Sequence, residues 1–210
     1  GTPEVDFDLR AAGEKGKATG FYSWKKGRIE LRLKMDRYDT SIVPLLLQRS
    51  DIPLFGVMTG NLQVEIYPQD PLRNSGKVLL EIPDLKLGDL NFGEGEGAFR
   101  LPSLQLSQEG SPPSRIDLLM EKGNLEVKQI QLTGVDLGLQ MDGKVYGARQ
   151  LENYRFNLKG HLKIGASLEA KIPFLAIVEK QKLPDGTYPF TITGRVSSPS
   201  IRVGDFKIPL

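Results

Sequence analysis

The sequence predicts a mostly β protein: an antiparallel, highly twisted and curved sheet with two short capping helices. Apolar and polar residues alternate with a period of two in many short segments. Glycine-containing turn signals separate these segments by about ten residues, which leaves no room for the helical crossovers of a parallel sheet. The 210 residues are 39% hydrophobic and 26% charged, as in one folded domain spanning 1–210 and not in a disordered chain.

Five segments show the alternation most clearly. In residues 28–35, Ile29, Leu31 and Leu33 fall on one face, while the charged residues between them fall on the other. The other four clear segments are residues 61–67, 135–142, 154–159 and 190–193. Weaker strands are predicted at 5–9, 76–82, 115–120, 124–132 and 162–164. Each clear segment therefore predicts a strand with one buried and one solvated face.

Five glycines mark predicted reversals of the chain between these strands. They lie in short runs with Asn, Asp, Ser, Thr or Lys: Gly60, Gly76, Gly123, Gly143 and Gly186. A faint repeat accompanies them, because residues 60–64 resemble 123–127 and residues 76–78 resemble 143–145. Either Gly-Asn-Leu is a common way to enter a strand, or the sheet grows by repeated addition of hairpins.

Two short helices interrupt the strand pattern. Residues 42–48 follow Ser41, whose hydroxyl can cap the helix. Residues 173–180 form the second apolar run, with lysines at its C-terminal end, where cations suit the helix dipole. Each helix has about two turns and would not persist alone, so both are expected to dock on the sheet.

The residue inventory excludes several classes of chemistry. The chain has no cysteine, which excludes thiol catalysis and cysteine-bound zinc. The net charge is +2 with charges interspersed, so no nucleic-acid-binding stripe is visible. The single histidine, His161, is out of phase with apolar Leu162 and is expected to face solvent. Residues 93–97 are glycine-rich but carry two acids and precede no helix, which favours a turn or bulge over a phosphate loop. We therefore expect no enzyme, metal or cofactor.

The apolar strand faces are the strongest physical feature of the sequence. Alternation fits a core closed by a second sheet or by helices, and it equally fits an open groove. Two short helices are little cover for so many strands, which favours the groove. The residues expected to line this face are Leu62, Val64, Ile66, Leu125, Val127, Leu137 and Leu139.

A family resemblance is carried mainly by the C-terminal part of the chain. Residues 185–199 follow the pattern DG-x-Y-x-F-x-I-x-G-x-V-S-x-P. The short helix at 42–47, the run Ile52-Pro53-Leu54-Phe55-Gly56 and the glycine-led strands of 123–143 agree with it. Together, across residues 40–205, these patterns resemble the type II secretion system protein N family. The same turn-and-strand pattern is shared by AsmA-like β-groove proteins.

The resemblance implies a non-enzymatic accessory component of a bacterial type II secretion system. Such a protein would act in the periplasm through contacts with other envelope proteins. It would be tethered to the inner membrane by an N-terminal anchor upstream of Gly1. The wider relatives imply an alternative, a lipid-binding or lipid-transfer module that uses an apolar groove. Neither implication includes a catalytic set, a metal or a cofactor.

Overall fold

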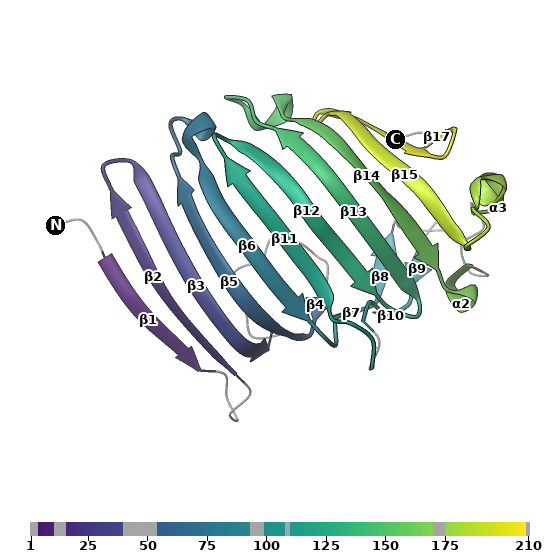
Figure 1. Cartoon of the computed structure of the whole chain (residues 1–210), viewed down its shortest axis with the longest axis horizontal. Helices are drawn as coiled ribbons and strands as arrows, with labels where there is room; N and C mark the ends of the chain where they lie inside the picture. Colours follow the sequence, from purple (N-terminus) through teal and green to yellow (C-terminus); the bar gives the residue numbers. More distant parts are fainter. Residues whose placement is uncertain are drawn as a thin grey trace.

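One antiparallel sheet of twelve strands dominates the computed structural model, which describes residues 4–10, 16–39, 54–92, 99–107, 110–169 and 175–208 (Figure 1). The strands lie side by side in chain order, with β4 and β7 to β10 left out. They are β1 (Glu4–Arg10), β2 (Lys17–Lys25), β3 (Arg28–Asp39), β5 (Val57–Ile66), β6 (Ser75–Ile82), β11 (Ser114–Glu121), β12 (Asn124–Thr133), β13 (Leu137–Tyr146), β14 (Arg155–Ile164), β15 (Thr187–Arg195), β16 (Ser198–Val203) and β17 (Phe206–Ile208).

Smaller elements join and flank this sheet. The insertion between β6 and β11 carries four short strands. Of these, β7 pairs with β4 on one side and with β10 on the other in a three-stranded sheet, while β8 pairs with β9. The short strands are β4 (Leu54–Phe55), β7 (Lys86–Leu87), β8 (Leu90–Phe92), β9 (Phe99–Leu101) and β10 (Leu104–Gln105). The helical segments are η2 (Pro71–Arg73), η4 (Leu151–Asn153), α2 (Ala166–Glu169), α3 (Leu175–Val178) and η5 (Glu179–Gln181).

The strand register places most apolar residues of the main sheet on one face. Directly paired residues of neighbouring strands share a face, so the pairing can be followed from strand to strand. One such row crosses ten strands and consists only of apolar residues and glycine: Leu33, Leu62, Val78, Leu118, Val127, Gly143, Leu158, Ile192, Ile201 and Ile208. The opposite face carries most of the charged residues. We call these the apolar face and the polar face.

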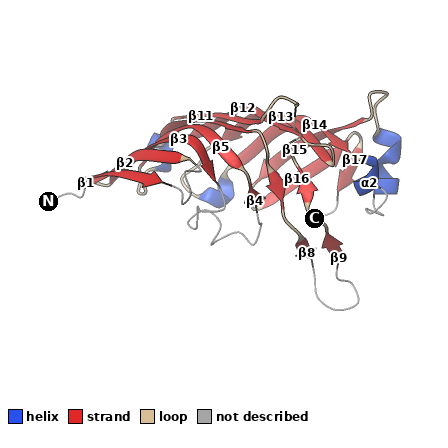
Figure 2. Ribbon diagram, turned by 90° about the horizontal axis from the view of Figure 1, so that it is seen from below, coloured by secondary structure: helices blue, strands red, loops and turns tan. Residues whose placement is uncertain are grey.

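The sheet is curved, and its apolar face lies on the concave side. Figure 2 shows the sheet arching over β4, β8 and β9. Leu104 and Leu106, at and just after β10, pack in one buried cluster with Met58 and Ile82 of the apolar face. The sheet is not closed, because β1 and β17 are its two ends in the strand order.

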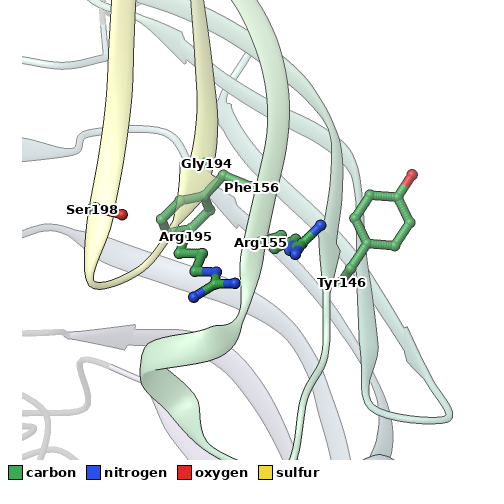
Figure 3. A pocket seen from close by; sticks show the side chains of 6 residues that line it. All are labelled: Tyr146, Arg155, Phe156, Gly194, Arg195 and Ser198. Atoms are coloured by element: carbon green, nitrogen blue, oxygen red, sulfur yellow. The ribbon is translucent and has the colours of Figure 1, made fainter.

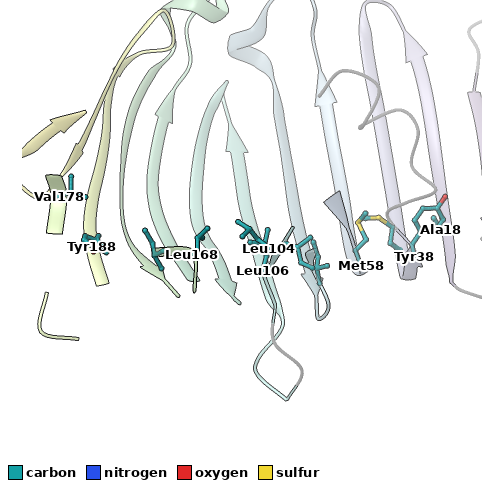
Figure 4. Packing of buried hydrophobic residues seen from close by; sticks show 12 residues of the cluster. Ala18, Tyr38, Met58, Leu104, Leu106, Leu168, Val178 and Tyr188 are labelled. Atoms are coloured by element: carbon teal, nitrogen blue, oxygen red, sulfur yellow. The ribbon is translucent and has the colours of Figure 1, made fainter. Parts of the chain in front are cut away.

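The main buried cluster lies at one end of the strands, which we call the covered end. Figure 4 shows its side chains in a line across this end. Here β5 begins, β6 ends, β14 ends and β15 begins. The buried members are Ala18, Met35, Tyr38, Met58, Ile82, Leu85, Leu104, Leu106, Ile164, Leu168, Val178 and Tyr188. At the other end, the open end, β13 finishes at Tyr146 and β14 starts at Arg155.

Two buried serines fix the insertion to the main sheet at the covered end. Ser107 Oγ donates to the carbonyl oxygen of Ile82 at 2.8 Å, and Ser114 Oγ donates to that of Leu106 at 2.8 Å. The two hydroxyl oxygens lie 2.7 Å apart. Both residues are almost fully buried. Because unpaired buried hydroxyls are costly, these bonds specify one position for the insertion.

The mostly β, antiparallel and curved architecture is confirmed, and each predicted strand has a described counterpart. Two predicted turns are wrong. Gly60 lies inside β5 and Gly143 lies inside β13, both with positive φ. A Cβ at either position would collide with a carbonyl oxygen of the adjacent strand, Leu79 for Gly60 and Asn157 for Gly143. The glycines permit close backbone approach within strands instead of reversing the chain.

The predicted helices have a different outcome. The predicted helix at residues 42–48 and the glycine-rich run at 93–97 lie outside the described residues. Part of the predicted helix at 173–180 is present as α3, which η5 continues, and Val178 of this segment is buried. A pair of capping helices is therefore not established. A further short helix, α2, follows β14 and was not predicted; its Leu168 enters the main cluster.

Candidate functional site

The seven residues expected from the sequence all lie on the apolar face. Leu62 and Val127 belong to the same row across the sheet. Val64 and Leu125 share the next row towards the open end. Ile66 is the last residue of β5 and lies at the open end itself, 39% exposed. These five residues therefore occupy the half of the concave face away from the main cluster.

The other two expected residues lie apart from these five. Leu137 is the first residue of β13, pairs with Ile164 and packs against the main buried cluster. Leu139 pairs with Leu162, two residues further along. Both therefore lie in the half of the face near the covered end, where the insertion and α2 also contribute side chains. Whether any of the seven residues lines a ligand site stays a prediction.

A second apolar cluster lies on the half of the face that contains Leu125 and Val127. Its buried members are Val127, Val145 and Leu158, and half-buried neighbours include Leu125 and Phe156. Every member described comes from β11 to β15, apart from Tyr154, which directly precedes β14. Among the described side chains, this cluster is therefore built by neighbouring strands of the main sheet and has no member from the insertion. We call this the strand cluster.

Large apolar side chains remain exposed where the same face reaches β2 and β5. Trp24 is 52% exposed and pairs with Ile29, which pairs in turn with Ile66. Ile29, between these two exposed residues, is half-buried. Exposed apolar side chains cost free energy in water, and exposed apolar patches are typical of binding surfaces. The concave face is therefore covered at one end and partly exposed at the other.

A pocket of about 660 Å³ lies at the open end beside the strand cluster (Figure 3). It is lined by Tyr146, Arg155, Phe156, Gly194, Arg195 and Ser198. Four of these are strand termini: Tyr146 ends β13, Arg155 begins β14, Arg195 ends β15 and Ser198 begins β16. The polar and apolar faces meet at this rim, so guanidinium groups and an aromatic ring line one space. We call it the rim pocket.

Arg155 and Arg195 form an adjacent cationic pair in the rim pocket. They are directly paired across β14 and β15, so both side chains leave the same face of the sheet. Within the described part of the chain, no carboxylate forms an ion pair with either arginine. Like charges on directly opposed strand positions repel each other, so the pair is unfavourable unless an anion lies between them.

Other arginines of the polar face are paired with carboxylates. Glu30 accepts from Arg28 at 3.3 Å and also pairs with Arg32. Arg115 lies 3.3 Å from Glu81 and 3.7 Å from Asp117. These three arginines have their charge balanced by carboxylates of the protein, unlike Arg155 and Arg195 of the rim pocket.

The rim pocket was not predicted from the sequence. Arg155 and Arg195 are forty residues apart in the sequence. Each fits the pattern of a polar residue on the solvated face of a strand. Only the register of β14 with β15 makes them neighbours. The one signal available was that Arg155 lies near the start of the predicted strand 154–159 and Arg195 lies just beyond the predicted strand 190–193.

A hydrogen-bonded group at the covered end holds α2 to β15. Lys182 Nζ and Tyr188 Oη both donate to Glu169 Oε1, at 2.7 and 2.8 Å. These two bonds, that from Lys182 first, lower the pKa of Glu169 below its usual 4.5. The bond to Glu169 also raises the pKa of Lys182, and burial raises that of Tyr188. These hydrogen bonds join α2 to β15 at the covered end, away from the rim pocket, so we treat them as a structural anchor.

No metal centre or membrane-spanning helix is found in the described ranges. Groups of three or more potential metal ligands are missing there. His161 is exposed on the polar face, opposite Gln140 and Pro189, so its expected orientation towards solvent is confirmed. The described helices include none long and apolar enough to cross a membrane.

Comparison with protein-family models, curated proteins and solved structures gives no match to this chain.

Proposed function

We propose that this protein is a non-enzymatic lipid-binding module whose concave apolar face holds an acyl chain. The observation that carries the proposal is the apolar face that continues beyond the main buried cluster and becomes exposed at Trp24 and Ile66. A side of a sheet that served only as a core would be covered along its whole length. Among the side chains that the structure describes, those of the insertion contribute to the cluster at the covered end and not to the strand cluster.

The energetics of acyl-chain binding fit such a surface. Each methylene group that moves from water onto an apolar surface contributes about 0.8 kcal/mol. A chain of ten or more methylenes could therefore outweigh the cost of association, which is of the order of several kcal/mol. A curved sheet suits this ligand, because an acyl chain is narrow and can follow a concave apolar strip.

A second candidate function follows from the sequence resemblance. It is an accessory role in a type II secretion system, in the periplasm at the inner membrane, through contacts with other envelope proteins. The edge strands of the sheet favour it, because β1 has a described partner strand on one side only. An edge strand can accept a strand from another protein.

Binding of cis-parinaric acid, whose fluorescence rises when its chain leaves water, tests the proposed function. We expect saturable binding by the parent protein. Leu125→Glu places a carboxylate on the apolar face close to the open end, so the variant should stay folded and bind at least about tenfold more weakly. Gln140→Glu adds the same charge on the polar face of β13 and should bind as the parent does.

Two results would reject the lipid-binding proposal. One is a parent protein that does not enhance the probe's fluorescence. The other is equal loss of binding in both variants, which would indicate a charge effect without a defined site. Melting temperatures of all three proteins separate loss of binding from loss of folding.

A further inference from the structure

The rim pocket gives the proposed lipid ligand a defined headgroup and direction. We propose that Arg155 and Arg195 bind the phosphate of an anionic phospholipid, whose acyl chains run from the rim onto the strand cluster. This inference rests on the proposed function, since it names the class of lipid held by the same concave face.

The first argument is charge complementarity. The two arginines are directly opposed on β14 and β15, and neither has a carboxylate partner among the residues that the structure describes. A phosphate between them would accept charge-assisted hydrogen bonds from both guanidinium groups and remove their mutual repulsion. Ser198, opposite Arg195 on β16, adds a hydroxyl donor to the same pocket.

The second argument is the mixed lining of the pocket. Phe156 alternates with Arg155 along β14, and it belongs to the half-buried shell of the strand cluster. Phe156 also pairs with Val145, a buried member of that cluster. The pocket thus connects the cationic pair to the apolar face, because Arg155 and Phe156 are consecutive residues of β14. A free phosphate would use only the arginines, whereas an amphiphilic molecule with an anionic head matches both parts of the lining.

The third argument is size and access. The pocket has a volume of about 660 Å³ and is open to solvent at the ends of four strands, so a headgroup can enter without moving the sheet. Arg155 and Arg195 are exposed, and their long side chains can close on a phosphate while the headgroup keeps contact with water. This exposure makes headgroup binding weaken as salt rises.

Calorimetric titration with short-chain phosphatidic acid and phosphatidylcholine, carrying identical acyl chains below their micelle concentration, tests the inference. The parent protein should bind phosphatidic acid at least about tenfold more tightly than phosphatidylcholine. The double variant Arg155→Gln/Arg195→Gln should lose this preference and retain the binding of phosphatidylcholine. Both arginines are exposed, so the variant should melt as the parent does.

A matched control separates local binding from net charge. Arg202 and Lys207 are also directly opposed and exposed on the polar face, but they lie on β16 and β17 away from the rim pocket. Arg202→Gln/Lys207→Gln removes the same two charges and should keep the full preference for phosphatidic acid. Equal loss in both double variants would overturn the assignment to the rim.

The remaining outcomes distinguish the two proposals. If the parent binds both lipids equally and the rim variant changes nothing, acyl-chain binding stands and the headgroup site is wrong. If the parent binds neither lipid, the proposed function fails and the headgroup site fails with it. If inorganic phosphate displaces phosphatidic acid at equal concentration, the rim is a simple anion site and the lipid assignment is overturned.

Discussion

Gly143 shows how one residue shapes this sheet. Its φ is +135° in the middle of β13, and any side chain there would meet the carbonyl oxygen of Asn157. Gly143→Ala should therefore destabilise the protein by about 2–4 kcal/mol, because both backbone strain and a collision with the neighbouring strand oppose it. Urea unfolding measures this loss.

Gly138 provides the control on the same strand. Its added Cβ would approach the Cβ of Lys163 at 3.3 Å, which small shifts can relieve, and no positive φ is involved. Gly138→Ala should cost less than half as much as Gly143→Ala. Equal unfolding midpoints for the two variants would show that Gly143 has no special role in β13.

The roles of Gly60 and Gly143 could not be predicted from local sequence. Gly-Asn and Asp-Gly are typical of tight turns, and that is how the pattern was interpreted. What decides between a turn and a strand glycine is how closely the next strand approaches, a property of the folded sheet. By contrast, Gly123 and Gly186 adjoin the starts of β12 and β15, where turns were expected.

At the scale of elements, the anchor between α2 and β15 predicts a specific pH dependence. The folded-state pKa of Glu169 lies below its usual 4.5, so the anchor contributes stability above that pH. The contribution is lost as pH falls through the lowered pKa. Glu169→Gln removes this titration, and its melting temperature should fall less than that of the parent between about pH 5 and pH 3.

The melting temperature at alkaline pH provides a second test of the same anchor. The pKa of Lys182 is raised above 10.5, so its contribution is present below that pH and is lost as pH rises through the raised value. Glu169→Gln should weaken this pH dependence as well. Glu121→Gln, at an exposed residue that forms no ion pair within the described part of the chain, should follow the parent at acid and at alkaline pH. If melting temperature depends on pH in the same way in all three proteins, the proposed stabilising role of Glu169 is wrong.

Most long strands could be predicted from sequence, although the nine-residue β2 was not predicted, and the two-residue strands could not be. The alternation in 28–35 and 61–67 lies within β3 and β5, because each strand has one apolar and one polar face over many residues. The insertion strands β7 and β10 have two residues each, too few to show a period. They are strands because of their partners in the fold. The rim pocket was missed for a similar reason, since its arginines meet only through strand pairing.

At the scale of the whole molecule, the two halves of the apolar face should respond differently to the same substitution. Leu137 is partly buried and packs against the main cluster at the covered end, so Leu137→Glu would place an unpaired carboxylate against buried apolar side chains. It should destabilise the protein by about 3–5 kcal/mol or prevent folding. Leu125→Glu, nearer the open end, should lower the melting temperature much less. Equal losses would mean that the whole face is a closed core.

The most direct test of the central claim is the position of a bound acyl chain relative to the two faces. Phe156 and Asn157 are consecutive in β14 and point to the apolar and polar faces. In a Trp24→Phe background, Phe156→Trp and Asn157→Trp each place a sole tryptophan on one face. Fatty acids brominated on the chain should quench the fluorescence of the Phe156→Trp protein strongly and that of the Asn157→Trp protein little. Equal quenching, or none in either protein, would contradict acyl-chain binding on the concave face.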